Sequence, residues 1–412
     1  MPEPTEETAV STSTPDTPTP QRRGLRALVA ATGVSSVGDG AFIAAAPLAA
    51  AAITRDPAAV ATVAAAEFLP WIVVAPFAGV YVDRWPRRVT MVIADAARAL
   101  TVAVLAILIA VGAGSVTAIA VCAFLTMAGT VFHSAAREAI TATMATGQDR
   151  HTVNGRVQSV TTAGKQLAGP PVGSALFVLA PWSPFLLDAA SFAASAALLT
   201  QLPPGHVADA DHGRVLQAIR AGARYVFGNR DLRTMVVIIA LGNIASNLTL
   251  AIMVLYATDP TGLHIAPAAY GLLLVAMAAG GIIGGWVAPH LIARLGTWPT
   301  FILGGVGEAA GWLTLAVTSN PYIAGTAVAV CFIAITVVTV VVIGARQQLT
   351  PSHMLGRVVS AFRMVGNGTA PLGAMAGGVV AAAWGLRAPM VAAAAVLAVA
   401  TAFAVRAHLH GG

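Results

Sequence analysis

Ionisable side chains inside long apolar runs are the residues of this sequence best suited to do chemistry. They are Asp39, Glu67, Asp95, Arg98, Lys165, Asp188, Glu308 and Arg363. A charge at the centre of a membrane-spanning helix costs about 2.5 to 3.5 kcal/mol on insertion scales, so each of these groups needs a partner or a function. A carboxyl group in such a place can carry a proton or balance the charge of a cationic ligand.

Asp39 and Glu67 are the two proton-coupling candidates. Asp39 stands between Gly38 and Gly40, and glycines let a neighbouring helix approach closely. Loss of water penalises a charged carboxylate, which suits a group that takes up and releases a proton. Glu67 precedes Trp71 in the next apolar run and serves either as a second proton site or as the counter-charge of a cationic substrate. The alternative for both acids is a satisfied packing or gating contact.

Further polar residues complete a candidate substrate cavity, which comprises Asp39, Glu67, Trp71, Lys165, Asn243, Asn247 and Arg363. Asn243 and Asn247 are four residues apart, so they share a helix face, where they hydrogen-bond either a substrate or a neighbouring helix. Lys165 and Arg363 either extend their charge toward the membrane surface or balance an acid across the cavity.

The remaining reactive side chains predict no other chemistry. Asp95 and Arg98 lie three residues apart and can neutralise each other on one helix face, which indicates a structural pair. Cys122 and Cys331 both lie in apolar runs, so we expect buried thiols, no disulfide and no metal site. The sequence has no phosphate-binding GxxxxGK[ST] or zinc-binding HExxH motif. We therefore expect no cofactor and no enzymatic activity.

Composition predicts that the solvent of most of this chain is lipid. Apolar residues make up 57% and charged residues 10% of its 412 residues, and the mean hydropathy is +0.79. The net charge of +6 is spread over short connections between apolar runs, which is the distribution of a membrane protein and does not indicate nucleic-acid binding.

The apolar runs predict an all-α integral membrane protein with twelve transmembrane helices, since each run is long enough to cross a bilayer. The first six run over 25–53, 57–81, 89–112, 115–135, 156–180 and 184–202. The second six run over 232–257, 266–293, 298–317, 321–344, 357–383 and 387–406. The predicted division is a disordered cytoplasmic tail at 1–23, a six-helix bundle at 24–202, a cytoplasmic linker at 203–231, a second bundle at 232–407 and a cytoplasmic tail at 408–412.

Arginines fall almost entirely in alternate connections, which fixes the predicted orientation. One side carries most of them, and the connections of the other side carry only Arg55 and Arg387. Because positive charge stays in the cytoplasm, we expect a multi-pass protein of the cell inner membrane with both termini cytoplasmic.

A repeat relates the two sets of helices. The segment GRVQS at 155–159 recurs as GRVVS at 356–360, and Pro170 corresponds to Pro371 at the same offset. Both segments open the fifth predicted helix of a half, which indicates a duplicated six-helix unit.

The connection after the second predicted helix reads GVYVDRWPRR, with Gly79, Asp83, Arg84, Arg87 and Arg88 at its marked positions. It resembles the GxxxDRxGRR signature of the major facilitator superfamily, which implies two pseudo-symmetric bundles around a central cavity. The resemblance makes Asp83 a gate residue that meets the start of the eleventh helix, near 356–357, when the cavity faces outward. Proline replaces the usual glycine before Arg87. The alternative is that the arginines only set the topology.

The fifth predicted helix carries Gly164, Gly169, Pro170 and Gly173. These residues resemble the glycine-proline motif of antiporters in this superfamily, without its closing pair of glycines. Glycine allows close helix packing and proline bends a helix, which together give a flexible seam or ordinary packing. The resemblance favours proton antiport and therefore export.

Longer phrases, such as AEFLPWIVVAPFAGVYVDRWPRR and AAYGLLLVAMAAGGIIGG, resemble the enterobactin-exporter-like branch of actinobacterial efflux proteins. The resemblance implies a secondary transporter that exports a small amphipathic or hydrophobic molecule, such as a drug, an antibiotic or a siderophore, with protons and the bilayer as its other partners. In this family the helices that hold Asp188 and Glu308 usually face lipid or scaffold, so we expect little from these acids. The alternatives are a proton-coupled uptake symporter and a membrane sensor that kept the fold.

Overall fold

Helices make up nearly all of the described structure. The computed structural model describes residues 20–144, 148–202 and 215–409, and within these helices it leaves some side chains undescribed, including those of 76, 79, 80 and 83. Most of the tails predicted at 1–23 and 408–412 lies outside the described residues. The first helix begins at Pro20 and the last ends at Leu409, so each overlaps its predicted tail by a few residues.

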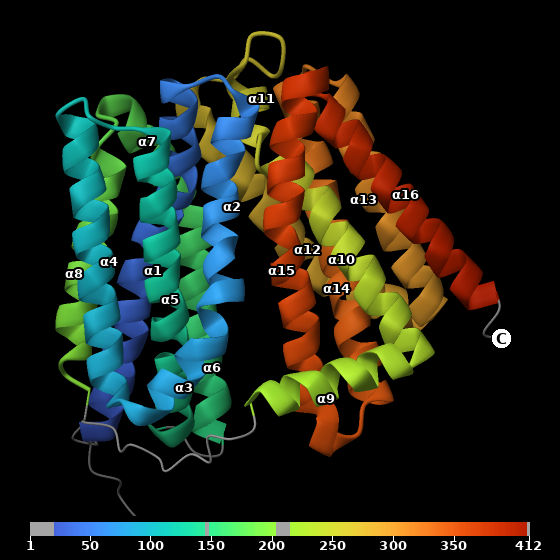
Figure 1. Ribbon diagram of the computed structural model, residues 1–412, viewed down its shortest axis with the longest axis horizontal. Helices are drawn as coiled ribbons and strands as arrows, with labels where there is room; N and C mark the ends of the chain where they lie inside the picture. The colour runs from blue at the N-terminus through green and yellow to red at the C-terminus, as the bar shows by residue number, and fades with distance from the viewer. Residues whose placement is uncertain (1–19, 145–147, 203–214, 410–412) are drawn as a thin grey trace, which may run out of the picture.

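The first half of the chain forms one group of helices (Figure 1). In chain order they are α1 (Pro20–Ile53), α2 (Pro57–Val73), α3 (Ala75–Arg84), α4 (Arg87–Ala110), α5 (Val116–Met144), α6 (Gln148–Thr161), the π-helix η1 (Thr162–Ala168), α7 (Gly169–Leu179) and α8 (Ser183–Leu199).

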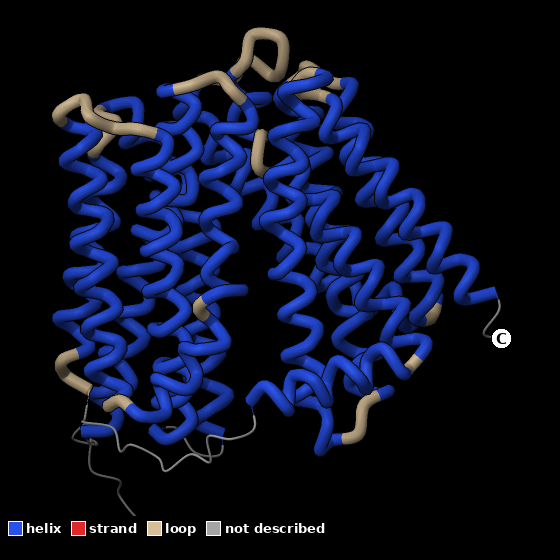
Figure 2. The backbone as a smooth tube through the Cα atoms, in the orientation of Figure 1, coloured by secondary structure: helices blue, strands red, loops and turns tan. Residues whose placement is uncertain are grey.

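The second half forms the other group, drawn from green to red in Figure 1. Its helices are α9 (Val215–Gly228), α10 (Arg230–Leu250), α11 (Met253–Thr258), α12 (Pro267–Leu295), α13 (Thr297–Val317), α14 (Pro321–Leu349), α15 (Ser352–Trp384) and α16 (Ala388–Leu409). Figure 2 shows that tan loops only join the ends of the helices.

Two predicted helices are interrupted where proline removes a backbone donor. The run predicted at 57–81 breaks at Val74 into α2 and α3, one turn after Pro70 and just before a further proline at 76. The run predicted at 156–180 is α6, η1 and α7. The amide of Gly169 donates to Gly164 O, five residues back, immediately before Pro170. The local widening of the helix therefore directly precedes the prolines.

The predicted linker at 203–231 contains a helix. α9 packs against α15 and α10, and the Tyr225 hydroxyl donates to Leu349 O at 3.0 Å. Gly222 lies directly against the backbone of Arg357. α9 runs across the lower ends of the second group in Figure 1, so the connection includes an ordered element.

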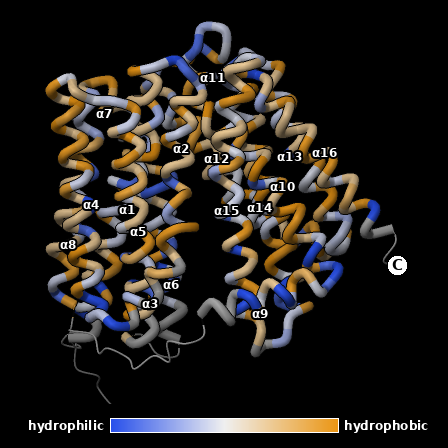
Figure 3. Tube along the Cα trace, in the orientation of Figure 1, coloured by the Kyte–Doolittle hydropathy of each residue, from blue (hydrophilic) through white to orange (hydrophobic). Residues whose placement is uncertain are grey.

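The helices are built to lie in a membrane. Within the described ranges, eight helical stretches are long and apolar enough to cross one, and Pro57–Val73 and Ser183–Leu199 are shorter apolar helices. Hydrophobic residues line the sides of the molecule in Figure 3, with more hydrophilic residues near its ends. The chain is thus a multi-pass membrane protein, while the count of twelve crossings and the domain boundaries stay predictions.

Among the described residues, the two halves share an apolar core at one end of the molecule and not at the other. We name the end that holds Arg84, Arg87 and Arg88 the basic end and the other the opposite end. One apolar cluster at the opposite end joins both halves, with Phe42 and Tyr256 among its members. Toward the basic end each half has a separate cluster. The halves are therefore joined at the opposite end and separate at the basic end.

Helix contacts agree with this arrangement. Between the halves, α2 packs on α15, and α7 and η1 pack on α12. Gly378 of α15 lies against Pro57, Ala58 and Ala61 at the start of α2. α3 and α6, which continue α2 and α7 toward the basic end, pack only within the first half among the element pairs with substantial contact.

Candidate functional site

A buried cluster of charged side chains lies inside the first half, between α1, α4, α5 and α8. Arg98 Nη1 donates to Asp95 Oδ1 at 2.8 Å, and Arg98 Nη2 donates to Asp39 Oδ1 at 3.1 Å. His133 Nδ1 lies 2.9 Å from Asp95 Oδ1, and Ser195 Oγ donates to Asp95 Oδ2 at 2.6 Å. One arginine therefore joins the acid predicted to pair with it to the acid predicted to carry a proton.

The helix surfaces around this cluster leave little free space. The guanidinium carbon of Arg98 lies 3.7 Å from the centre of the Phe192 ring, a cation-π contact. A side chain at Gly129 would collide with the Arg98 stem, and one at Gly38 would collide with Asp188 and Ser191. Small residues on α1 and α5 are thus what allow the charged groups to fit.

Asp39 is the accessible acid of this cluster. Its side chain is 19% exposed, whereas that of Asp95 is fully buried and that of Arg98 is 3% exposed. Asp188 of α8 is also fully buried, and its Oδ2 has no hydrogen-bond partner. Asp39 is therefore the more exposed of the two carboxylates that hold Arg98.

The other predicted cavity residues are only partly brought together. Glu67 of α2 and Lys165 of η1 interact electrostatically, and both are half-buried, as is Trp71. Arg363 of α15 is exposed and interacts with Arg346, a like charge. Glu67 thus has an electrostatic interaction with a cation but no ion pair among the described contacts, and no described acid pairs with Arg363.

The glycine-proline motif lies between two neighbouring helices. Gly164, Gly169 and Gly173 pack against the 36–41 stretch of α1, where an added side chain would collide with backbone. The backbone of Pro170 contacts Gly271 of α12, in the other half. The motif thus lies at the joint between the first half and the second, and Asp39 lies within the stretch of α1 that it contacts, with its side chain directed to Arg98 of α4.

The gate motif lies at the basic end. Arg87 Nη1 donates to Ala139 O at 3.1 Å and Arg88 Nη1 donates to Leu202 O at 2.8 Å, both within the first half, while Arg84 is exposed. The predicted gate positions Gly79 and Asp83 lie outside the residues whose side chains are described. Arg357 packs on α9, so the predicted latch between the halves stays a prediction for another conformation.

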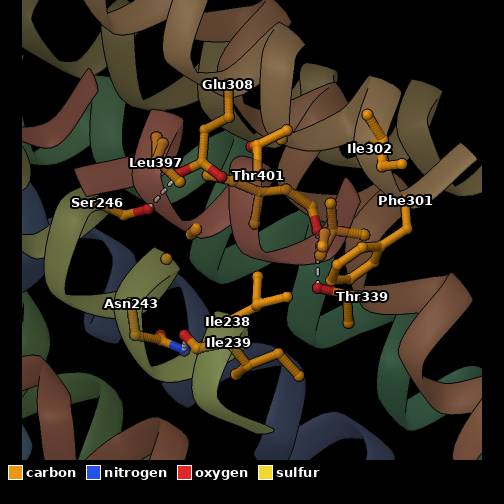
Figure 4. Close-up of a pocket in the computed structure, with 16 residues that line it drawn as sticks. Ile238, Ile239, Asn243, Ser246, Phe301, Ile302, Glu308, Thr339, Leu397 and Thr401 are labelled. Carbon is orange, nitrogen blue, oxygen red and sulfur yellow. Dashed lines mark hydrogen bonds between the residues drawn. The ribbon is translucent and has the colours of Figure 1, made fainter. Parts of the chain in front are cut away.

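The two asparagines of α10 separate. Asn243 lines a cavity in the second half with Ser246, Glu308 and Thr401 (Figure 4). Asn247 is buried and donates to the backbone oxygen of Asn243 at 2.8 Å, within its own helix. Asn243 also donates to Ile239 O, at 3.0 Å, within its own helix, and the predicted role of both asparagines in substrate binding stays a prediction.

Sequence reasoning missed His133, Ser195, Ser246 and Trp312. Each lies in an apolar run and has a partner on another helix or one turn away on its own. A histidine in an apolar run is a usable signal. Serine and tryptophan in membrane helices give none, because their partners depend on how the helices are rotated.

Comparisons with known proteins agree with this geometry. The family described as transmembrane secretion effector matches residues 17–411. An uncharacterized MFS-type transporter of Mycobacterium tuberculosis is 44% identical over 61 residues, which cover 15% of this chain and only 14% of that protein.

Solved structures share the fold. A mutant form of the nucleoside transporter NupG is 16% identical, with a TM-score of 0.77 over 92% of this chain and 99% of that one. A bacterial homologue of the iron transporter ferroportin, in its inward-facing state, is 16% identical, with a TM-score of 0.75 over 93% and 98%. The structure of such a homologue in the outward-facing state is also 16% identical, with a TM-score of 0.57 over 93% of this chain and 99% of that one. The chain belongs to the transmembrane secretion effector family and is a membrane transporter of the major facilitator type.

Proposed function

We propose that this protein exports a small amphipathic or hydrophobic molecule, such as a drug, an antibiotic or a siderophore, by proton antiport and alternating access. The observation that carries the proposal is Asp39, the accessible acid of a buried cluster, held by Arg98 at 3.1 Å. A proton that reaches Asp39 neutralises it and releases one contact of Arg98. Asp39 lies in the same stretch of α1, 36–41, against which the glycine-proline motif packs.

Export is supported by the family description as a secretion effector and by the resemblance to the enterobactin-exporter-like branch. Glu67, which interacts electrostatically with Lys165, is either a second proton-coupling site or the counter-charge of a cationic substrate. Trp71 and Asn243 supply apolar and hydrogen-bonding surface, which is the usual composition of a small-molecule site.

The state described is the one that loads substrate in this mechanism. We assign the basic end to the cytoplasm, following the distribution of arginines, so that both termini are cytoplasmic and the membrane is the inner one. The joined opposite end and the higher TM-score with an inward-facing neighbour than with an outward-facing one support an inward-open conformation. Asp83 and the following arginines then form the latch after the halves rock.

The test is pH-gradient-driven movement of a cationic fluorescent dye in reconstituted vesicles. The wild-type protein is compared with Asp39→Asn and Glu67→Gln, and with Asp231→Asn as a control at an exposed acid. Antiport predicts that the dye moves in the direction opposite to the flow of protons. This movement should be lost in Asp39→Asn and retained in the control. Movement of dye together with protons supports the uptake symporter instead. Equal, gradient-independent movement in every variant contradicts proton coupling.

A further inference from the structure

Glu308 of α13 lies at a cavity inside the second half, away from the first-half cluster. The cavity has a volume of about 120 Å³ and is lined by residues of α10, α13, α14 and α16. Figure 4 shows the Glu308 carboxyl near Ser246 and Thr401. Most of the remaining lining is aliphatic, with Phe301 the aromatic member. An acid in such surroundings is costly unless it is neutralised.

The carboxyl has hydrogen-bond donors on one oxygen only. Ser246 Oγ donates to Glu308 Oε1 at 2.7 Å and Trp312 Nε1 donates to the same oxygen at 3.3 Å. No described residue donates to Oε2. The Glu308 side chain is 4% exposed, and no described cation forms an ion pair with it. Its charge is therefore uncompensated by the described part of the protein.

The groups facing Glu308 from neighbouring helices are almost all neutral. α14 contributes Cys331, whose thiol contacts Glu308 O at 3.6 Å. The described side chains of α10 and α16 that line the cavity are uncharged, and so are those of α14. The charged residues Arg230, Asp231 and Arg233 lie at the far end of α10. No described group other than Glu308 holds a charge in this cavity.

The cavity extends from Glu308 toward the basic end. Its lining passes from Ser246 and Glu308 to Phe301, in the first turns of α13, and to Thr339, which is exposed. Its volume is several times the roughly 10 to 15 Å³ that one water needs. Asn243, Thr339 and Thr401 offer hydrogen bonds along the way, so a short chain of water fits.

The chemistry favours a proton over other cations. A metal ion needs several ligands, and within the described residues no group of three or more histidines, cysteines or acids could hold one. A drug-sized cation needs a pocket of about 300 Å³ or more, which exceeds this volume. A proton needs only the free oxygen and a water path.

We propose that Glu308 is a proton-binding site of the second half, reached from the basic end through this cavity. This goes beyond the proposed function, which assigns the proton to Asp39 and Glu67. Binding of a proton converts the carboxylate into a neutral acid and weakens its hold on Ser246 of α10. The second half then senses the proton concentration on the side where substrate is loaded.

Infrared difference spectroscopy on reconstituted protein, with no substrate and no gradient, tests the site directly. Stepping the pH should produce the carbonyl band of a protonated carboxylic acid, and Glu308→Gln should remove it. Asp39→Asn should leave that band in place, which separates this proposal from the antiport mechanism. A band unchanged by Glu308→Gln overturns the proposal.

The access path is tested by the rate at which the Glu308 carboxyl exchanges its proton for deuterium. Thr339→Phe places a large side chain at an exposed lining position of the cavity, so proton exchange should slow roughly tenfold or more, as a barrier higher by about 1.4 kcal/mol implies. Val330→Phe, at an exposed position on the same helix outside this cavity, should exchange like the wild type. Unchanged exchange in Thr339→Phe overturns the access route.

Trp312 provides a second readout if Glu308→Gln fails to fold. Its indole donates to Glu308 Oε1, so wild-type fluorescence should change in the pH range of the infrared band. Trp312→Phe should lack that change. A pH-dependent signal that persists in Trp312→Phe, together with no infrared band, contradicts proton binding at Glu308.

Discussion

The interiors of the two halves differ at matching positions. Arg98 is the twelfth residue of α4, and Glu308 is the twelfth residue of α13, which are the third long helices of their halves. Arg98 is held by two carboxylates at 2.8 and 3.1 Å. Glu308 has no described cationic partner and borders a cavity of about 120 Å³. One half thus has buried charges that join its helices, and the other has a buried acid without a described cationic partner beside a cavity.

The packing that surrounds these interiors is shared. In the first half Gly169 and Gly173 press on the backbone of α1, and in the second half Gly373 and Gly377 press on the backbone of α10. The glycines of each pair are four residues apart, so each pair presents one face. Each half therefore has a close helix contact made by a pair of glycines, while the buried polar groups of the two halves differ.

Replacing Arg98 with methionine should give the largest effect. It leaves Asp39 and Asp95 without their cation, and breaking a buried ion pair from one side costs about 3 to 5 kcal/mol. We expect a strongly lowered melting temperature in detergent, measured by tryptophan fluorescence. Arg363→Met, at an exposed arginine of the second half, is the control. A melting temperature for Arg98→Met equal to that of the control would show that the charged cluster does not hold the first half together.

Gly173→Val and Gly377→Val should each lower the stability of the protein somewhat less than Arg98→Met does. A side chain at Gly173 would collide with Ala41 O, and one at Gly377 with Leu248 O. Overpacking typically costs about 1 to 3 kcal/mol. The measurement is the unfolding midpoint of each variant, with Gly344→Val as the control because no other atom lies close to that position. A loss confined to one half would contradict the shared helix contact.

Replacing one buried acid in each half with its amide should destabilise the two halves to different extents. Asp95→Asn removes a carboxylate that Arg98, His133 and Ser195 contact, so we expect a loss of about 1 to 3 kcal/mol. Glu308→Gln keeps shape and has no described cation to leave unpaired, so we expect less than about 1 kcal/mol. Both are measured as unfolding midpoints at neutral pH. Equal losses would mean that Glu308 is held as firmly as Asp95.

The smallest expected change in stability concerns Asp259, an acid outside both groups of helices, which serves as a reference for the buried acids. Asp259, between α11 and α12, accepts from Thr261 N at 2.8 Å and from Thr261 Oγ1 at 2.6 Å. These hydrogen bonds hold the pKa of Asp259 below its usual value. A lowered pKa stabilises the folded state above the unfolded pKa of about 3.9, and this stabilisation is lost as pH falls through the folded pKa.

Thr261→Val should therefore lower the melting temperature slightly at neutral pH and not at strongly acidic pH. Asp259 is largely open to water, so screening keeps the effect below about 1 kcal/mol. The measurement is the difference in melting temperature between wild type and variant as a function of pH. A difference in melting temperature that grows as pH falls would contradict a stabilising hydrogen bond from Thr261 to the charged form of Asp259.

The sequence predicted the contact between charged residues of one helix but not their contacts with residues of other helices. The sequence predicted Asp95 and Arg98 as a pair because their spacing of three is local to one helix. It treated Asp39 as separate, although Arg98 reaches it from 59 residues away. It also assigned little to Glu308 because its helix was expected to face scaffold or lipid, whereas the structure places it at a cavity. Partners across helices depend on rotation about each helix axis, which no single run reveals.

What the sequence alone determined follows from local rules. Apolar runs and arginine-rich connections indicated the membrane class, because bilayer thickness and charge asymmetry act on each segment separately. The gate and glycine-proline motifs indicated the superfamily, and the repeated GRV segments predict a duplication. Tertiary structure alone decided that one arginine links two acids of different helices, that the described parts of the halves share a core at the opposite end, and that Glu308 borders a cavity. These features come from packing between helices distant in sequence, where a modest rotation about a helix axis turns a buried partner into a lipid-facing side chain.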